Sequence, residues 1–330
     1  MSVLVTGGAG YIGSHMVLAL LDAGRDVVVL DNLTTGRREL VPAGARLVVG
    51  DIADGALLLR LIARHGIGAV VHFAGSIVVP ESVADPLGYY LNNTVRTRAL
   101  IETCVLAGVK HFIFSSTAAV YGIPAANPVG EDAPTAPISP YGTSKLMTEL
   151  MLRDTAAAHD LRYVALRYFN VAGADPRGRS GQATPRATHL IKVASEAALG
   201  RRDGVEVFGE DYPTPDGTGV RDYIHVADLA EAHVLALGHL ERGGGSLTLN
   251  CGYGRGHSVR EVIAAVKRAS GVDFAVRHGP RRAGDPPALV AKSDLIRAKL
   301  GWQPRFDDLD TIVAHALGWE RQFLSGRAAA

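Results

Sequence analysis

A glycine-rich turn between an apolar segment and a helical pattern constrains the fold of this chain most strongly. The apolar residues 2–6 lead into Gly7-Gly8-Ala9-Gly10-Tyr11-Ile12-Gly13, and a periodic segment follows at 14–23. This order predicts a β-strand, a tight turn and an α-helix. Glycines at positions 7, 10 and 13 let the backbone turn sharply, approach a pyrophosphate closely and pack the helix on the sheet, with the anion at the helix N-terminus.

An acidic residue ends the second predicted strand. Residues 27–31 read Val-Val-Val-Leu-Asp, and Asp31 follows the glycine turn by about twenty residues. A carboxylate there can accept both hydroxyls of an adenosine ribose and repels a 2′-phosphate, which favours NAD over NADP. A glycine turn also arises for packing reasons alone, but this turn followed by Asp31 predicts a dinucleotide site.

Strand and helix patterns alternate through the first half of the chain. We expect further strands at 46–49, 69–73, 111–115 and 162–168, and helices at 54–65, 86–107 and 141–159. Apolar strands separated by helices predict an α/β fold of the Rossmann type, with a doubly wound parallel sheet. Because ligands of such sheets bind beyond the carboxyl ends of the strands, residues at those ends are candidates for the site.

Three strand ends supply these candidates. Asp51 and Ile52 are expected near the adenine, residues 73–75 along the cofactor, and Ser115 with its neighbours near the reacting groups. Of the two asparagines at 92 and 93, we favour a supporting role for Asn92, although capping of local backbone is the commoner use of an asparagine.

The alternation fades after residue 170. Residues 172–186 are a Gly/Pro/Arg-rich connection, and we expect helices at 189–199, 226–240, 259–270 and 309–323, strands at 206–208 and 246–250, and loops at 211–219 and 277–287. We therefore divide the chain into an NAD-binding domain (1–170) and a smaller α/β substrate domain (171–330) that is interleaved with it.

Composition limits the partners. The 330 residues are 47% hydrophobic, enough for a substantial core, and the net charge of +1 gives no general attraction to nucleic acid or an anionic membrane. Cys104 and Cys251 lie far apart without a CxxC pattern, which argues against a disulfide scaffold or a zinc site. With no apolar run of membrane-spanning length and no leader, we expect no metal, no membrane contact and a cytoplasmic location.

A phenol and an ammonium share one face of the helix that begins near residue 140. Tyr141 and Lys145 are four residues apart, which stacks both side chains on that face. A cation about 4 Å from a phenol, at an effective dielectric near 20, is worth roughly 4 kcal/mol or about three pKa units. We expect Lys145 to lower the pKa of Tyr141 and make it a proton acceptor, although such a pair also arises by chance.

Several motifs together resemble an extended short-chain dehydrogenase/reductase. They are Gly7-x-x-Gly10-x-x-Gly13, Asp31-Asn32, Gly50-Asp51-Ile52, Phe114-Ser115-Ser116-Thr117, Tyr141-x-x-x-Lys145 and Arg167-Tyr168-Phe169-Asn170. Residues 211–226 (DYPTPDGTGVRDYIHV) and 281–285 (RRAGD) narrow the resemblance to the UDP-glucose 4-epimerase family, over nearly the whole chain.

This resemblance implies reversible inversion at C4 of a UDP-hexose, with NAD bound tightly and regenerated in each cycle. Tyr141 would take the proton of the sugar 4-hydroxyl while C4 gives its hydride to the nicotinamide, and the resulting 4-keto sugar would turn before both return. Lys145 would lower the tyrosine pKa and hold the nicotinamide ribose. Thr117 would hydrogen-bond the reacting oxygen or relay its proton.

The resemblance also implies two sets of binding residues. Those expected at NAD are Gly7, Gly10, Tyr11, Ile12, Gly13, Asp31, Asn32, Asp51, Ile52, Phe73, Ala74, Gly75, Asn92, Ser115, Tyr141, Lys145 and Tyr168. Those expected at the UDP-sugar are Thr117, Tyr141, Asn170, His189, Leu190, Val207, Phe208, Arg221, Arg282 and Asp285. Among these, Asn170, Arg221 and Arg282 would hold phosphates and sugar hydroxyls, Asp285 the uridine ribose region, and Val207 and Phe208 the uracil.

Four positions depart from the family pattern. Thr117 stands where many relatives have serine and keeps the hydroxyl, and Ile77 replaces a lysine that some relatives place on the cofactor ribose. His189 stands at a position often held by asparagine, so it either contacts the substrate or caps a helix. Leu289 replaces a residue that gates N-acetylated sugars, which leaves their acceptance open.

Other functions remain open at this point. A 4-epimerase for UDP-N-acetylglucosamine or UDP-arabinose fits the same motifs. A nucleotide-sugar 4,6-dehydratase needs an acid-base pair after the threonine, where this chain has Ala118-Ala119. A non-catalytic NAD sensor needs only the glycine turn and Asp31, so the Thr117, Tyr141 and Lys145 set argues against it. The family further implies a homodimer formed through paired long helices.

Overall fold

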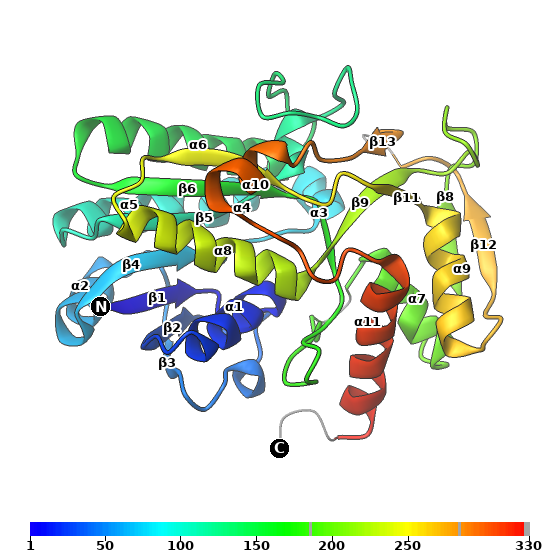
Figure 1. Cartoon of the computed structure of the whole chain (residues 1–330), viewed down its shortest axis with the longest axis horizontal. Helices are drawn as coiled ribbons and strands as arrows, with labels where there is room; N and C mark the ends of the chain where they lie inside the picture. Colours follow the sequence, from blue (N-terminus) through cyan, green and yellow to red (C-terminus); the bar gives the residue numbers. More distant parts are fainter. Residues whose placement is uncertain (185–186, 283–284, 327–330) are drawn as a thin grey trace.

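The computed structural model describes residues 1–184, 187–282 and 285–326, and its main element is a seven-stranded parallel sheet (Figure 1). The strand order is β10-β6-β5-β4-β1-β2-β3, and all neighbouring pairs are parallel. The strands are β1 (Ser2–Thr6), β2 (Val27–Asp31), β3 (Arg46–Val49), β4 (Ile67–His72), β5 (His111–Thr117), β6 (Arg162–Tyr168) and β10 (Leu247–Cys251). This arrangement confirms the Rossmann-type sheet.

Helices cover both faces because successive strand residues point to opposite sides. Val3 and Val5 pack in one cluster with residues of α1 and α8, whereas Leu4 packs in another with residues of α2, α5 and α6. The bounds are α1 (Tyr11–Asp22), α2 (Gly55–His65), α5 (Arg96–Leu106), α6 (Pro140–Ala158) and α8 (Val226–Glu241). Helix α1 begins at Tyr11, three residues before the periodic segment, because the glycine turn itself forms the helix start.

The central sheet draws on both halves of the chain. Its strand β10 pairs with β6, and α8 packs against α1, although both come from beyond residue 170. The residues that follow the first six strands in sequence therefore complete the same sheet. The two expected domains are interleaved in this way, and a single boundary at residue 170 does not describe the contribution of β10 and α8 to the central sheet.

The helix predicted at 86–107 is present from Pro86 to Leu106, but it is not α-helical throughout. It consists of α4 (Pro86–Tyr89), the π-helical turn η2 (Tyr90–Val95) and α5, and a short helix α3 (Val79–Ala84) precedes it. A π-helical turn contains one extra residue, so it rotates the side chains that follow relative to a regular α-helix. The predicted helix is therefore confirmed, and the π-helical turn within it is the feature that the sequence did not predict.

A smaller α/β unit lies at the end of the molecule opposite the N-terminus (Figure 1). Its helices α7 (Leu190–Ala198), α9 (Val259–Ser270) and α11 (Leu309–Leu324) surround one core, and α10 (Asp294–Leu300) packs on the central sheet side. Its strands are β7 (Asn170–Ala172), β8 (Val205–Phe208), β9 (Val220–His225), β11 (Gly256–Ser258), β12 (Val276–Gly279) and β13 (Ala288–Leu289). This confirms the smaller α/β unit.

The predicted loop at 277–287 begins as a strand. Residues of β12 pair in parallel with β8, from Val276 opposite Val205 to Gly279 opposite Phe208. Ala283 and Gly284 of the RRAGD motif lie outside the described residues, as do Arg186 and the last residues of the chain. Among the helices that the structure describes, none combines the length and apolarity of a membrane span.

Candidate active site

Thr117, Tyr141 and Lys145 meet where β5 ends and α6 begins. The hydroxyl of Ser139 accepts a hydrogen bond from the Gly142 amide at 3.2 Å, and Pro140 opens the first turn, so the helix start is well defined. All three predicted catalytic residues are buried, with 8% exposure for Thr117 and Tyr141 and 3% for Lys145. Their side chains therefore form one preorganised group.

Lys145 is anchored to the neighbouring strand. Its ammonium donates a hydrogen bond to the carbonyl oxygen of Ser115 at 3.0 Å and lies 5.1 Å from the centre of the Phe114 ring. Burial lowers the pKa of Lys145 to about 8. The helix spacing that places Lys145 next to Tyr141 thus also directs its head group to β5.

The pKa of Tyr141 differs from our expectation. Burial raises the pKa of this phenol above its usual value, and a hydrogen bond from Thr117 opposes part of the increase. Desolvation of the phenolate dominates in this arrangement, and the ammonium of Lys145 is bonded to a backbone carbonyl instead. The net shift is therefore opposite to the one we expected, because burial outweighs the interactions that favour the phenolate, such as the hydrogen bond from Thr117.

The glycine turn fits a bound pyrophosphate. Gly7 has a positive φ of 71°, and a Cβ there would lie 2.6 Å from the amide nitrogen of Ala74. A Cβ at Gly13 would lie 2.1 Å from the Gly7 carbonyl oxygen. The N-cap of α1 is Gly10, which has no side chain to cover the first N–H groups of the helix. The amide donors that begin at Tyr11 and Ile12 can therefore bind an anion.

Asp31 lies beside this turn. Its carboxylate oxygens accept hydrogen bonds from the amides of Ala9, at 3.0 Å, and Leu33, at 2.8 Å. Each oxygen keeps a further lone pair for a ribose hydroxyl. Gly36, which sequence reasoning missed, covers the carboxylate, because a Cβ there would lie 3.0 Å from both oxygens. These remaining acceptor positions on Asp31 fit the hydroxyl donors of an adenosine ribose.

The other adenine-side candidates lie at the ends of β2 and β3. Asn32 is exposed and accepts a hydrogen bond from the amide of Thr34, and Ile52 is buried. The carboxylate of Asp51 pairs with Arg96 at 3.3 Å. These positions are consistent with the sheet edge that the alternation predicted, while their contact with a cofactor stays a prediction.

Asn93 is a functional candidate that the sequence analysis did not select. It is buried in η2, its side chain holds the backbone amide of Ser76 at 2.7 Å and the carbonyl at 2.9 Å, and it donates to the hydroxyl of Ser144 at 3.1 Å. Asn92 instead donates to the Ser76 hydroxyl and accepts from Arg96. Asn93 therefore connects the segment after Gly75 to the helix that carries Lys145.

Aromatic residues from two strand ends meet on α8. The rings of Phe73 and Tyr168 lie 4.9 Å and 6.3 Å from the imidazole of His233. The hydroxyl of Tyr168 is hydrogen-bonded to that of Ser115. The structure thus brings Phe73, Ser115 and Tyr168 together beside Lys145, along the expected path of the cofactor.

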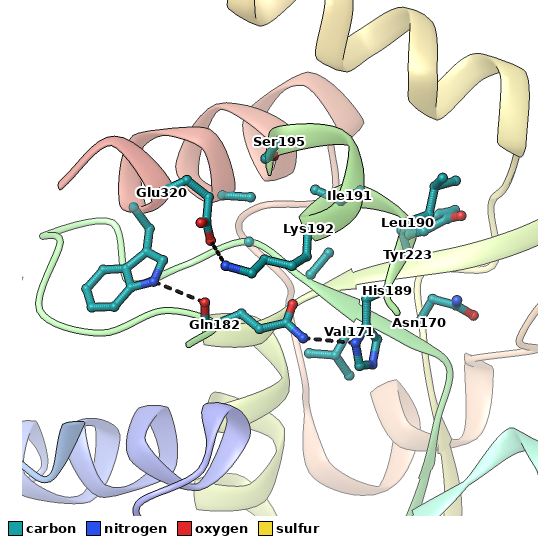
Figure 2. Close-up of a pocket in the computed structure, with 14 residues that line it drawn as sticks. Asn170, Val171, Gln182, His189, Leu190, Ile191, Lys192, Ser195, Tyr223 and Glu320 are labelled. Atoms are coloured by element: carbon teal, nitrogen blue, oxygen red, sulfur yellow. Dashed lines mark hydrogen bonds and ion pairs between the residues drawn. The ribbon is translucent and has the colours of Figure 1, made fainter. Parts of the chain in front are cut away.

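Part of the predicted substrate set lines one pocket in the smaller unit. Asn170, His189 and Leu190 face this pocket, together with the buried ion pair between Lys192 and Glu320 (Figure 2). The amide nitrogen of Gln182, which sequence reasoning missed, lies 2.9 Å from Nδ1 of His189. An amide NH₂ can only donate, so Nδ1 accepts and the neutral ring carries its proton on Nε2.

The structure bears on the two roles considered for His189, which are substrate contact and capping of a helix. His189 is the N-cap residue of α7, yet among the described residues its side chain caps no amide of that helix. Burial lowers the pKa of His189, which keeps the ring neutral. Helix capping is therefore excluded for the described arrangement, and the interaction with Gln182 takes its place.

The remaining substrate candidates form two pairs on loops and short strands. The guanidinium of Arg282 lies 3.8 Å from the centre of the Phe208 ring, and that of Arg221 lies 3.9 Å from the carboxylate of Asp285. Val207, which precedes Phe208 in β8, is buried. Leu289 is the partner of Arg221 in the pairing of β13 with β9 and belongs to the cluster that contains Phe169.

A Rossmann-type sheet with a buried Tyr-x-x-x-Lys pair and a threonine at the end of β5 defines a dinucleotide-dependent enzyme of the extended short-chain dehydrogenase/reductase class. Residues 3–252 match the family model described as the NAD-dependent epimerase/dehydratase family. The chain belongs to this family.

Relatives along the full length agree with this assignment. A UDP-glucose 4-epimerase of Azospirillum brasilense is 63% identical over 319 residues, which cover 97% of this chain and 92% of the relative. The crystal structure of a UDP-glucose 4-epimerase from Brucella ovis in complex with NAD is 50% identical, with a TM-score of 0.93 and coverage of 96% and 97%. That of a UDP-Glc/GlcNAc 4-epimerase from Campylobacter jejuni is 49% identical, with a TM-score of 0.85 and coverage of 97% and 99%.

Proposed function

We propose that this enzyme interconverts UDP-glucose and UDP-galactose by reversible inversion at C4, with NAD as a bound cofactor. The observation that carries the proposal is the buried group of Thr117, Tyr141 and Lys145 at the sheet edge that also carries the glycine turn and Asp31. The similarity to UDP-glucose 4-epimerases over nearly the whole chain supports the substrate.

The residues of the chain have distinct tasks in this reaction. When bound, NAD would accept the hydride from C4 of the sugar and return it to the same carbon in the same cycle. Tyr141 takes the proton of the 4-hydroxyl at its phenolic oxygen and returns it to the same sugar oxygen after the ring has turned, and the Thr117 hydroxyl bridges the two oxygens. Because the group is buried, water is kept from the intermediate 4-keto sugar.

Binding at the nucleotide end permits the inversion. Arg221 and Arg282 hold the diphosphate through charge-assisted hydrogen bonds, while Phe208 and Val207 contact the base and Asp285 the ribose. With the UDP moiety held in this way, the sugar ring can turn about the phosphate linkage and present its other face. In the smaller unit, Asn170 and His189, with its proton on Nε2, are the donors that line the pocket.

The test is incubation of the purified protein with UDP-glucose or UDP-galactose, with products separated by configuration at C4. We expect both directions to reach the same equilibrium mixture without net accumulation of NADH. Stoichiometric NADH would instead indicate a dehydrogenase. UDP-N-acetylglucosamine and UDP-arabinose belong in the same panel, because turnover of either in place of the UDP-hexoses would identify the alternative 4-epimerase.

An exposed apolar surface supports a homodimer as part of this proposal. Leu87, Leu91 and Val95 recur every four residues along α4 and η2 with exposures of 77%, 51% and 53%, and Met147 and Leu150 of the adjoining α6 are also exposed. A second copy of the chain, packed through the same helices, would bury them. We expect light scattering to give a dimer that Leu87→Glu weakens, whereas Ile123→Glu, at an exposed position outside these helices, does not. A monomer at micromolar concentration would contradict the dimer.

We place the enzyme in the cytoplasm. Both cysteines, Cys104 and Cys251, are buried free thiols. Burial raises the pKa of the Cys104 thiol to about 12, which suppresses the reactive thiolate. Unpaired thiols of this kind are typical of proteins in a reducing compartment.

A further inference from the structure

A buried polar network lies immediately behind the catalytic group. The guanidinium of Arg167 binds the carboxylate of Glu149 through Nε at 2.9 Å and Nη2 at 2.6 Å. The hydroxyl of Ser116 donates to the same carboxylate at 2.5 Å. Exposure is 7% for Arg167, 6% for Glu149 and zero for Ser116. These contacts are thus shielded from water.

The network extends across three adjacent strands. In the sheet register, Ser116 of β5 lies opposite Arg167 of β6, and Arg167 lies opposite Asn250 of β10. Nη1 of Arg167 donates to the hydroxyl of Tyr121 at 3.0 Å, and this hydroxyl donates to the side chain of Asn250 at 2.7 Å. The row lies one residue before the row that contains Thr117 and Tyr168.

Glu149 joins this row to the catalytic helix. Tyr141, Lys145 and Glu149 recur every four residues along α6, so their side chains lie on one face of the helix. Lys145 bonds to the carbonyl of Ser115, and the next residue of β5, Ser116, bonds to Glu149. Two consecutive residues of β5 therefore hold two consecutive turns of α6, just before Thr117.

We propose that Ser116, Glu149, Arg167 and Tyr121 are positioning residues that set the distance and orientation of Tyr141 and Lys145 relative to Thr117. This inference rests on the proposed function, which it deepens. None of the four side chains needs to touch the substrate. They oppose sliding and rotation of α6 along β5 and β6, and Tyr121 fixes the short 3₁₀ turn Ala118–Tyr121 that directly follows Thr117.

Geometry, rather than charge, is the reason that this network affects the rate. The Glu149 carboxylate is paired with a guanidinium, so the pair as a whole adds no net charge to the site. Proton transfer requires the donor and acceptor at hydrogen-bond distance, and a misplacement of about 1 Å can cost a hundredfold in rate. A loosened α6 therefore lowers kcat while the binding of UDP, which other elements hold, stays the same.

The decisive variant is Ser116→Ala in the holoenzyme, because it removes one hydroxyl and leaves the ion pair in place. We expect kcat to fall about tenfold to a hundredfold and the KM for UDP-galactose to stay within about twofold. Ser116→Thr, which keeps a hydroxyl, is expected to restore most of kcat. The matched control is Ser293→Ala, since Ser293 is also buried and donates to a backbone carbonyl, that of Gly252, outside this network.

A second pair of variants separates positioning from stability. Tyr121→Phe is expected to lower kcat, whereas Tyr163→Phe, at a buried tyrosine of β6 outside the network, is not. The exchange Glu149→Leu with Arg167→Met replaces the buried pair by apolar side chains, which often preserves stability. We expect this double variant to keep its melting temperature within a few degrees and still lose kcat.

The outcomes are distinguishable from a failure of the proposed function. If the wild-type enzyme does not epimerise UDP-hexoses, the proposed function fails in the same assay before any variant is compared. If the wild type is active and Ser116→Ala keeps its kcat, the positioning role is wrong. The same holds if Ser116→Ala only lowers the melting temperature, by as much as Ser293→Ala does. Recovery of full kcat in the double variant would also overturn it.

Discussion

The proposed catalytic group and the arginines proposed to bind the substrate are built in opposite ways. Thr117, Tyr141 and Lys145 are buried on a central strand and a long helix. Arg282 is exposed on the loop after β12, and Arg221 lies on the short strand β9 with a weak contact to the exposed Asp285. One region is held by buried hydrogen bonds, and the other by surface contacts that water can replace.

This difference indicates where precision is needed. Proton transfer depends on distances of tenths of an ångström, so the groups that perform it lie on rigid elements. Long arginine side chains tolerate adjustment and can close on a diphosphate as it arrives. Each of the following experiments tests whether the rigid region controls kcat and the adaptable region controls binding.

The largest effect is expected for Tyr141→Phe. Loss of the phenolic oxygen removes the proton acceptor, so we expect turnover to fall at least a hundredfold, the usual contribution of acid-base catalysis. The fold and the bound NAD are expected to persist, because the ring is retained. Steady-state kinetics together with the ratio of NAD to protein test this expectation, and near-normal turnover would remove Tyr141 from the proposed role.

Acid is expected to destabilise the rigid region. Burial lowers the pKa of His72 to about 3 and of His233 to about 4, so both stay neutral in the folded state. Below the unfolded pKa near 6.5 the unfolded chain binds more protons, and stability therefore falls as the pH falls. From pH 7.5 to 5.5 the two histidines are expected to cost about 3 kcal/mol.

Urea denaturation as a function of pH measures this loss. His233→Gln is expected to remove about half of the contribution of the two histidines. His159→Gln serves as the control, since His159 is exposed at the end of α6. An unchanged pH dependence in His233→Gln would contradict the assignment of a buried neutral imidazole.

The next effect concerns the adaptable region. Arg221→Ala and Arg282→Ala are each expected to weaken UDP binding about tenfold to a hundredfold, the worth of a charge-assisted hydrogen bond of roughly 1.5–3 kcal/mol. Turnover at saturating substrate is expected to change much less, and NAD content not at all. Calorimetric titration with UDP measures the binding, and the opposite pattern, an unchanged affinity with a reduced kcat, would break the comparison.

The smallest effect is expected at Thr117. Thr117→Val keeps the shape and removes the hydroxyl that bonds to Tyr141, so kcat is expected to fall about tenfold. Thr117→Ser keeps the hydroxyl and is expected to stay within about threefold of the wild type. Because this hydrogen bond favours the phenolate, Thr117→Val is also expected to shift the rising limb of the pH–rate profile to higher pH.

The features that sequence reasoning predicted share a local origin. The glycine turn, Asp31, the strands and the Tyr141 helix depend on residues that are close in sequence, and the structure contains each of these elements. Asn93 was missed because the π-helical turn changes which asparagine faces inward, and no spacing rule signals that turn. Arg167 was part of a motif but received no role, because its partners Glu149 and Tyr121 are distant in sequence. Gln182 was missed although its partner His189 is nearby in sequence, because the segment between them has no regular pattern.

The pKa of Tyr141 is a second property that local sequence could not predict. The spacing of Tyr141 and Lys145 correctly predicts a shared helix face, but the size of the desolvation term depends on the packing of the whole site. The direction in which the ammonium points depends on the carbonyl of Ser115, which belongs to another element. Local pattern therefore identifies the pair and not its protonation behaviour.

The late arrival of β10 in the central sheet has a consequence during synthesis. A ribosome that has released only residues 1–170 presents β6 as an open edge, with a row of backbone donors and acceptors that β10 later satisfies. Such an edge invites pairing with other chains. In the growing chain, the edge of β6 is covered only after residues up to Cys251 have been synthesised. A fragment that ends at residue 170 would keep this edge open and would be prone to aggregate.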